Sequence, residues 1–390
     1  MGKNIAVFFG GKSPEHDVSI ITALVSVIPP LKLLGHHVLP VYIAKNGDWF
    51  SAPELADIKT YQTGAIDKII ASAKPLKITM NGGLKIYQPA KLGREREFAV
   101  DVEFPALHGA NGEDGSLMGL FRMANVPFVG CDMEAAVVAM NKTLAKIVAE
   151  KAGILTPKFL SFRAAELNDN PEGMIEKIAR ELHFPLFVKP PHLGSSIGIS
   201  RVKNRAELLN ALEVAAHYDR EILVEEAVAN LIEITVPVVG ESDSPEPSLP
   251  ERPLTADDNF FDFDTKYLKG GKKGGAKNPS AKSGAQGYSE IPAKIAPKLY
   301  DECLSVAKKV YSALGLSGIS RVDLLVDAKA AKVYFNEVNP LPGSLYAHNF
   351  AKNGVSNVDL VAKLLDLAEQ DFAARNKVAT TFETNFLKQF

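Results

Sequence analysis

Two short stretches in the last fifth of the chain carry the groups with the most specific chemistry. "SRVDLLV" supplies Arg321 and Asp323, and "NEVNP" supplies Glu337 and Asn339, on neighbouring predicted strands. Carboxylate and amide oxygens are the hard donors that suit Mg²⁺ shared with phosphates. Arg321 precedes Asp323 by two residues and so lies on the same strand face, where it can neutralise charge in a phosphoryl or acyl transfer. The alternative, a surface ion pair between Arg321 and Glu337, explains only two of these residues.

A lysine followed by a loop of small residues, "VKPPHLGSSIGIS", indicates a phosphate site. Lys189 ends a predicted strand, and Gly194, Ser195, Ser196 and Gly198 follow it. Backbone N–H groups and hydroxyls of such a loop can bind phosphate oxygens, with the lysine as counter-charge. The stretch is not a P-loop, because its lysine precedes the glycines. A plain hairpin turn is the alternative.

Two further stretches are less specific. In "FFGGKSPEHDVS", Glu15 stands at a helix entrance, where it can receive an ammonium group or, with Ser13, cap the helix. A dinucleotide fingerprint would need a third glycine, which is missing. "VEEAV" with Glu233 beyond it predicts either a strand edge that binds a purine and its ribose or a strand with a solvated acidic face. Taken alone, helix capping and the solvated face are the better interpretations.

The elements that must position these residues alternate between strand and helix early in the chain, which indicates a parallel α/β layer. Periodicity predicts strands over 4–9, 38–43, 84–88, 101–109, 320–326 and 333–337, and helices over 19–34, 134–152, 205–217, 296–314 and 358–375. The strands over 221–228 and 232–240 are expected to pair in one further sheet. Residues 241–253 are expected to form an exposed connection. The lysine- and glycine-rich segment 266–290 has a length typical of a functional lid or a disordered segment.

Length and composition limit the classes of protein. A chain of 390 residues predicts two or three domains, with boundaries near 131 and 222. The net charge of −2 argues against nucleic acid or a membrane surface as partner. Cys131 and Cys303 lack metal-binding spacing and fit a reducing cytosol. We find neither a signal sequence nor an apolar run near the about 20 residues that span a bilayer, so we expect a cytoplasmic protein.

Together these stretches resemble the D-alanine–D-alanine ligase family of ATP-grasp proteins, in the family's order and over nearly the whole chain. The stretches are "FFGGKSPEHDVS", "FPALHGANGEDGSLMG", "FVKPPHLGSSIGIS", "FDFDTKYL", "SRVDLLV" and "NEVNPLPG". The resemblance implies an α/β (α+β) chain with the ATP-grasp fold. Its parts would be an N-terminal parallel α/β substrate domain (1–131), a central ATP-grasp domain (132–222), a C-terminal ATP-grasp domain (223–375) with a mobile loop (262–290), and a tail (376–390).

The resemblance also implies a reaction. ATP would convert the carboxylate of one D-alanine into an acyl phosphate, which the amine of a second would attack, giving D-alanyl-D-alanine for peptidoglycan precursor synthesis. A homodimer is implied as well. Catalytic roles are implied for Glu15, Ser195, Tyr267, Arg321 and Gly343, and substrate contacts for His108, His348 and Asn349. Contacts to ATP are implied for Lys142, Lys189, Ser195, Ser196, Glu225, Glu226, Val228, Glu233 and Lys266. Two Mg²⁺ ions, which Mn²⁺ can replace, are implied at Asp323, Glu337 and Asn339.

The chain departs from the family pattern in several places. Met118, Arg122 and Asn141 stand where the family usually has Gln, Glu and Asp. The turn after Gly343 reads "SLYAHN" in place of the family's usual run of small and hydroxyl residues. The second substrate therefore stays open between D-alanine and another acceptor, such as D-serine, D-lactate or another amino acid. A non-catalytic ATP-binding protein is a further alternative. The retention of every predicted metal and transition-state residue argues against it.

Overall fold

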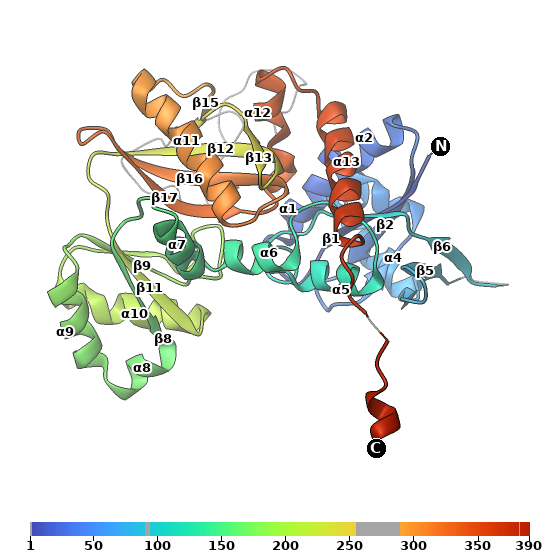
Figure 1. The fold of residues 1–390 in the computed structure, drawn as a ribbon, viewed down its shortest axis with the longest axis horizontal. Helices are drawn as coiled ribbons and strands as arrows, with labels where there is room; N and C mark the ends of the chain where they lie inside the picture. The colour runs from blue at the N-terminus through green and yellow to red at the C-terminus, as the bar shows by residue number, and fades with distance from the viewer. Residues whose placement is uncertain (1, 90–93, 255–288, 382) are drawn as a thin grey trace.

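Three four-stranded sheets organise the chain, each with helices against it (Figure 1). The computed structural model describes residues 2–89, 94–254, 289–381 and 383–390. Of the predicted lid, only its last two residues fall within these ranges, and Lys266 and Tyr267 lie outside them. The combination of sheets and helices confirms the predicted α/β (α+β) class.

The first sheet has the order β3-β2-β1-β7 and is parallel except at its β3 edge. Its strands are β1 (Asn4–Gly10), β2 (His37–Ile43), β3 (Trp49–Phe50) and β7 (Val102–Pro105). Every residue from 5 to 9 is fully buried, as expected of a parallel strand that is covered on both faces. A smaller antiparallel sheet of β4 (Lys77–Thr79), β5 (Lys85–Gln88) and β6 (Arg96–Ala99) shares the apolar core on one face of the first sheet.

The helix after β1 covers the other face of the first sheet. It runs through α1 (His16–Ile21), a π-helical segment (Thr22–Val27) and α2 (Ile28–Leu33). By length and composition residues 16–33 could cross a membrane, contrary to the expectation from the sequence, but 61% of this stretch is buried inside the fold. It therefore serves as a core helix. The remaining helices of this region are a 3₁₀ helix (Pro53–Ala56), α3 (Ile58–Gln62), α4 (Ile66–Ser72) and α5 (Ser116–Ala124).

The second sheet is antiparallel, with the order β10-β9-β11-β8. It comprises β8 (Phe159–Arg163), β9 (Leu186–Lys189), β10 (Ser200–Val202) and β11 (Glu221–Glu226), and its core also takes α8 (Ala164–Asp169), α9 (Pro171–Glu181) and α10 (Leu208–Tyr218). The prediction that residues 221–228 pair with 232–240 is wrong, because β11 pairs with β8 and β9. The boundary expected at 222 accordingly falls inside a strand of this sheet.

The third sheet is also antiparallel, with the order β13-β12-β16-β17. It comprises β12 (Leu231–Glu241), β13 (Ser244–Pro247), β16 (Gly318–Asp327) and β17 (Lys332–Asn339), and it packs against α11 (Pro297–Ala313). Its core also takes α6 (Met133–Met140) and α7 (Lys142–Lys151). By packing, residues 133–151 thus belong with the third sheet, although we had placed them in the central domain. The helix predicted over 134–152 is in fact two helices that meet at Asn141.

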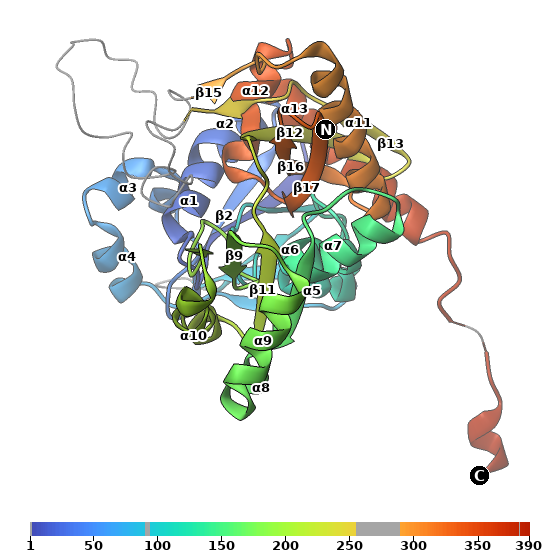
Figure 2. The same cartoon turned by 90° about the vertical axis from the view of Figure 1, so that its left-hand side faces the viewer.

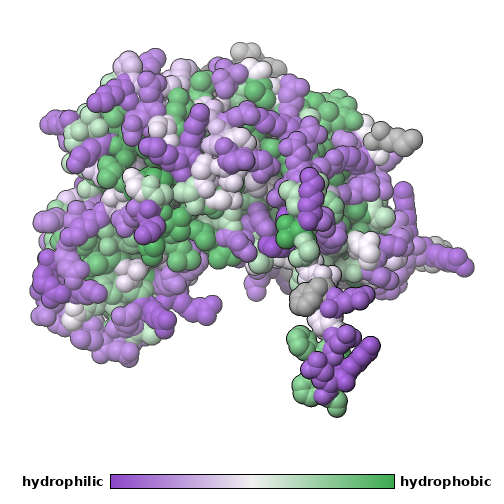
Figure 3. All heavy atoms as spheres, in the orientation of Figure 1, coloured by the Kyte–Doolittle hydropathy of each residue, from purple (hydrophilic) through white to green (hydrophobic). Residues whose placement is uncertain are grey.

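One prediction for the second half of the chain changes as well, whereas the helix expected over 358–375 is present as α13. Residues 241–253 are not a plain exposed connection, because they contain β13 and β14 (Arg252–Pro253), and Glu251 is 4% exposed. Strand β14 pairs with β15 (Ser289–Glu290). Helix α13 (Asn357–Arg375), which follows α12 (Ala347–Lys352), packs against α2 and joins the core of the first sheet. Beyond α13 the chain leaves the body of the molecule, as Figure 2 shows. Hydrophilic side chains cover most of the face of the molecule shown in Figure 3.

Glu103 in β7 is a polar group inside an apolar core. Its side chain is fully buried, and neither carboxyl oxygen has a hydrogen-bond partner among the described residues. Its strand neighbours Ala6 and Phe128 both belong to the apolar cluster that the first sheet shares with the small sheet. Burial raises the pKa of Glu103 well above its ordinary value. The carboxyl group therefore destabilises the fold at every pH at which it would be ionised in the unfolded chain.

We expect Glu103→Val to raise the free energy of unfolding by about 1–3 kcal/mol at neutral pH, the usual cost of a buried unpaired polar group. Since the folded pKa lies above the unfolded one, the destabilisation by Glu103 sets in as the pH rises through the unfolded pKa and levels off above the folded pKa. The gain from Glu103→Val should grow over the same window. Urea unfolding at a series of pH values measures it. Glu97→Val, the same change at an exposed strand position, should give no such gain.

Candidate active site

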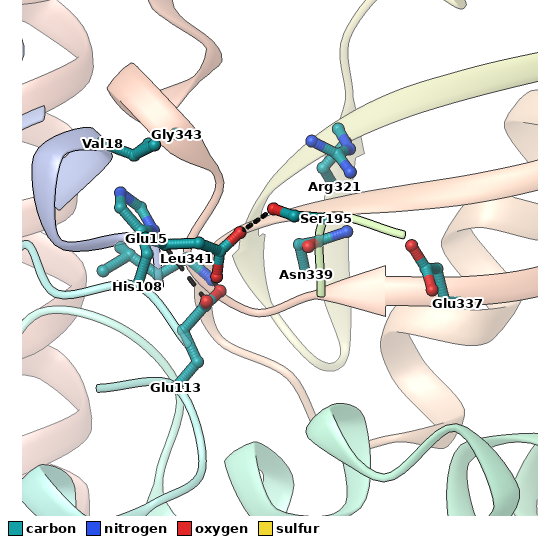
Figure 4. Close-up of a pocket in the computed structure, with 10 residues that line it drawn as sticks. All are labelled: Glu15, Val18, His108, Glu113, Ser195, Arg321, Glu337, Asn339, Leu341 and Gly343. Carbon is teal, nitrogen blue, oxygen red and sulfur yellow. Dashed lines mark hydrogen bonds and ion pairs between the residues drawn. The ribbon is translucent and has the colours of Figure 1, made fainter. Parts of the chain in front are cut away.

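A polar pocket lies where elements of all three sheets meet (Figure 4). It encloses about 400 Å³, including its opening to solvent. The residues that line it are Glu15, Val18, His108, Glu113, Ser195, Arg321, Glu337, Asn339, Leu341 and Gly343. All except Val18, Glu113 and Leu341 were predicted as site residues from the sequence. The fold thus gathers residues that are up to about three hundred positions apart in the chain.

Glu15 faces the pocket and does not cap its helix. It occupies the N-cap position of α1, but its side chain accepts no capping hydrogen bond. Instead its Oε1 accepts a hydrogen bond of 2.5 Å from Ser195 Oγ. Glycines permit this approach, since a Cβ on Gly109 would lie 3.0 Å from Glu15 Oε2 and one on Gly194 would lie 3.3 Å from Oε1. Capping by the Glu15 side chain is therefore wrong, whereas Ser13 Oγ does accept a hydrogen bond of 3.1 Å from the Glu15 N–H at the start of the helix.

The loop that carries Ser195 joins β9 to β10 but is more than a hairpin turn. Strands β9 and β10 are antiparallel neighbours, and the ten residues between them reach over to Glu15. Ser195 and Ser196 both adopt left-handed backbone conformations, with φ of 56° and 60°. Such conformations cost energy for non-glycine residues and persist where the surrounding structure imposes them, most often at functional sites.

The predicted metal donors lie together on the third sheet. The antiparallel register sets Arg321 opposite Asn339 and Asp323 opposite Glu337. Arg321 donates to both oxygens of Asp323, from Nε at 2.7 Å and from Nη2 at 2.6 Å. Asn339 Nδ2 donates to Asp323 Oδ2 at 3.2 Å. Glu337 forms an ion pair of 3.2 Å with the Nζ of Lys142. Asp323, Glu337 and Asn339 thus lie on one face of two paired strands, where Arg321 pairs with the first carboxylate and Lys142 with the second.

Behind these donors lies a buried network of two lysines and one glutamate. Glu225 is 2% exposed, and its carboxylate pairs with Lys189 and, at 3.1 Å, with Lys146. Burial tends to raise the pKa of Glu225, but the two ammonium groups outweigh it and hold the pKa below its ordinary value. The Glu225 carboxylate therefore holds the two lysines in place, and its contact to the nucleotide stays a prediction. Lys146 was not predicted, and its signal was its position one helical turn after Lys142.

The other predicted nucleotide contacts flank the connection between β11 and β12. Glu226 ends β11, where its backbone N–H bonds to Lys158 O and its carboxylate pairs with His183 at 2.9 Å. Val228 lies in the connection, and Glu233 follows near the start of β12. These residues border the connection between the second and third sheets, and their contacts to the nucleotide stay a prediction.

His108 and Glu113 form the wall beside Glu15. His108 Nε2 lies 2.8 Å from Thr22 Oγ1, and burial lowers the pKa of the imidazole. The carboxyl oxygens of Glu113 accept from the backbone N–H groups of Gly109 at 2.7 Å and Leu341 at 3.3 Å. Burial first, and the neighbouring Glu15 charge second, raise the pKa of Glu113 to about 8. Glu113 was missed, although it lies in the quoted "HGANGEDG" stretch five residues after His108.

The turn after Gly343 has an unusual backbone. Ser344, Leu345 and Tyr346 are all left-handed, with φ of 53°, 54° and 49°. The Ser344 N–H donates to Thr22 Oγ1 at 2.8 Å, which ties the turn to the helix after Glu15. The Tyr346 ring lies against the guanidinium of Arg321, with the Arg321 Cζ 5.4 Å from the centre of the ring. The turn therefore packs an aromatic ring against Arg321.

His348 and Asn349 contact a buried carboxylate. His348 Nε2 lies 3.1 Å from Glu251 Oε2, and the His348 ring packs against Tyr346. Asn349 is fully buried and donates from Nδ2 to Leu249 O at 2.9 Å and Glu251 Oε2 at 3.1 Å. Both residues were predicted to touch substrate, but neither lines the pocket among the described residues. In this structure they hold the turn in place.

The departures from the family pattern lie outside the pocket. Met118 is buried in the core beside the first sheet, and Arg122 pairs with Asp132 at 2.8 Å on the surface. Asn141 caps α7 by accepting from the N–H groups of Thr143 and Leu144. None of the three replaces a group that faces the cavity.

Comparison with known proteins agrees with this geometry. Profiles described as "D-ala D-ala ligase N-terminus" and "D-ala D-ala ligase C-terminus" match residues 4–131 and 148–366. The chain is 34% identical to a D-alanine–D-alanine ligase of Acetivibrio thermocellus, over 95% of this chain and 96% of that protein. It is 37% identical to one of Chlorobium limicola, over 94% and 97%.

Two solved structures are similar over almost their whole length. The VanG D-Ala:D-Ser ligase of Enterococcus faecalis has a TM-score of 0.77 at 30% identity, covering 94% of this chain and 100% of that one. The D-alanine–D-alanine ligase of Coxiella burnetii has a TM-score of 0.77 at 25% identity, covering 96% of each. Two antiparallel sheets with lysines and carboxylates between them define the ATP-grasp class of protein. The chain belongs to the D-alanine–D-alanine ligase family.

We expect Lys146→Met to lower the free energy of unfolding by about 3–5 kcal/mol, because it removes one partner from a buried ionic network and leaves Glu225 incompletely compensated. Urea unfolding measures the loss. Lys151→Met, on the exposed end of the same helix, should change stability by less than about 0.5 kcal/mol. An equal effect of the two substitutions would contradict the role of the network.

Proposed function

We propose that the protein is an ATP-dependent D-alanine–D-alanine ligase, which joins two D-alanines with release of ADP and phosphate and supplies a peptidoglycan precursor. The observation that carries the proposal is the convergence in one pocket of Glu15, hydrogen-bonded to Ser195, with Arg321, Glu337 and Asn339 of the third sheet. This arrangement combines a receptor for an ammonium group with groups that neutralise the charge of a transferring phosphoryl group. Family membership supports the same reaction.

The residues divide the reaction between them. Glu15 binds the ammonium group of the first D-alanine, whose carboxylate then points towards Arg321. Lys142, Lys189 and the loop with Ser195 and Ser196 hold the ATP phosphates for transfer of the γ-phosphoryl group to that carboxylate. The amine of the second D-alanine attacks the acyl phosphate, and phosphate leaves. Arg321 and the backbone N–H of Gly343 stabilise the oxyanion that forms during this attack.

Mg²⁺ is part of this proposal. Asp323, Glu337 and Asn339 would hold a pair of Mg²⁺ ions, or Mn²⁺ in their place, and the ions would supply positive charge to the ATP phosphates. The donor set fits, since two carboxylates and one amide oxygen on paired strands are ligands that Mg²⁺ prefers. We further propose that Lys266 and Tyr267 contribute to keeping water from the acyl phosphate, because that intermediate hydrolyses easily.

We also propose that the ligase is a homodimer in the cytoplasm. The homodimer rests on the family resemblance. The free, buried thiols of Cys131 and Cys303 support a reducing compartment.

The reaction is tested by incubating the purified protein with ATP, Mg²⁺ and D-alanine. We expect phosphate and D-alanyl-D-alanine in equal amounts, and loss of both when the metal is chelated. D-serine and D-lactate added as competing acceptors, with products identified by mass, show which acceptor the site takes. Phosphate release that does not depend on any D-amino acid would contradict the proposal.

We expect Arg321→Ala to lower kcat by about 10²- to 10³-fold, the usual effect of removing one oxyanion donor, while ATP binding changes much less. Steady-state kinetics and a direct ATP titration separate the two effects. Arg321→Lys is the matched control, because it retains the charge but loses the paired N–H donors to Asp323. A lysine variant with full activity would show that charge alone suffices at this position.

A further inference from the structure

The phosphate-binding loop is attached to the start of α7 by three successive residues. The backbone N–H of Lys142 donates to Pro191 O at 3.1 Å, and Lys142 Nζ donates to Leu193 O at 2.7 Å. Between these two bonds, Asn141 Nδ2 donates to His192 Nε2 at 3.0 Å. Lys142 and the loop are both proposed to hold the ATP phosphates. These bonds therefore fix the position of Lys142 relative to the loop. The family resemblance gave His192 no role.

The orientation of the Asn141 amide is determined by the helix. Its Oδ1 accepts from the N–H groups of Thr143 at 2.9 Å and Leu144 at 3.1 Å, so the amide oxygen must face α7. The NH₂ group therefore faces His192 and, at 3.3 Å, Glu221 Oε2. A flipped amide would lose both capping bonds, which normally stabilise a helix by about 1 kcal/mol.

This orientation selects one protonation state of His192. An Nε2 that accepts from Asn141 carries no proton, so the proton of a neutral ring lies on Nδ1. Nδ1–H donates to Asp219 Oδ2 at 2.9 Å, and the backbone N–H of His192 donates to the same oxygen at 2.9 Å. The neutral ring is thus satisfied on both sides. The imidazolium would instead direct an Nε2–H at the NH₂ group of Asn141.

We infer that Asn141 and His192 are positioning residues that fasten the 190–199 loop to α7 only while His192 is neutral. The inference rests on the proposed function for its effect on ATP, but the contact itself is defined by the hydrogen bonds alone. It also accounts for the asparagine at 141. An aspartate there would still cap α7, but its carboxylate would favour a protonated His192.

The pKa of His192 is set by several opposing interactions. The hydrogen bond to Asp219 raises the pKa of His192 most, burial opposes it, Asp219 and Glu221 raise it further by charge, and Lys142 lowers it. The net shift is upwards. Acidification therefore protonates His192. The imidazolium keeps its ion pair with Asp219 but can no longer accept the hydrogen bond from Asn141. Loosening of the loop would move Ser195 relative to Glu15 and Lys142 relative to Glu337.

The test compares the wild-type chain with Asn141→Asp, His192→Gln and the matched control Asn170→Asp. Asn170 is also an asparagine N-cap, of α9, and accepts from the Gly173 N–H at 2.9 Å, with no histidine beside its side chain among the described contacts. The eight histidines are followed by NMR titration, with His192→Gln assigning the signal of residue 192. The dissociation constant and KM for ATP are measured from about pH 6 to 8.5, a range about the ordinary histidine pKa.

We expect Asn141→Asp to raise the pKa of His192 by about one unit or more, as a carboxylate in contact usually does. In the wild-type chain the KM for ATP should rise severalfold as the pH falls through the pKa of His192, with kcat less affected. His192→Gln, whose amide can accept from Asn141 and donate to Asp219, should remove this pH dependence and keep the KM of the alkaline form. Asn170→Asp should match wild type in every measurement.

An unchanged pKa of His192 in Asn141→Asp, or an ATP pH profile that survives in His192→Gln, would overturn the inference. The NMR titration requires no turnover. A chain without ligase activity that still shows the His192 shift would therefore contradict the proposed function and leave the positioning contact standing.

Discussion

The site depends on one buried interaction, the carboxylate of Glu225 between the ammonium groups of Lys146 and Lys189. Lys146 comes from α7, whose apolar face belongs to the third sheet, whereas Lys189 and Glu225 come from neighbouring strands of the second. All three groups are almost fully buried, so each charge must be compensated by the others. The geometry of the phosphate site is therefore coupled to the contact between the two sheets. A shift of one sheet against the other would leave a charge without its partner.

A second constraint brings the first sheet to this contact. The loop after β9 reaches across to Glu15, and the turn after Gly343 bonds to Thr22, so both flanks of the pocket are attached to the helix that follows β1. Non-glycine residues in left-handed conformations occur in both segments. Backbone strain of this kind is tolerated where several tertiary contacts impose it. The pocket therefore exists only when all three sheets are assembled.

What could be predicted followed local periodicity. Arg321, Asp323, Glu337 and Asn339 alternate along two strands, and that alternation is enough to place them on one face, as the register of β16 and β17 confirms. The assignment of β11 failed because an apolar strand does not reveal its partner, and partners are chosen by long-range packing. Glu251 was placed in an exposed connection because its neighbours are polar and proline-rich. Only its contacts with His348 and Asn349 explain its burial.

The sequence by itself determined the chemical inventory and, through six ordered motifs, the family. It did so because side-chain type and spacing along strands and loops are local properties. The tertiary structure alone decided which charges neutralise one another. It pairs Arg321 with Asp323 and Lys142 with Glu337, places Glu225 between two lysines, and leaves Glu103 without a partner among the described residues. It also decided that Asn141 faces a histidine. Such pairings depend on distances of a few ångströms between segments far apart in the chain, and no local pattern contains them.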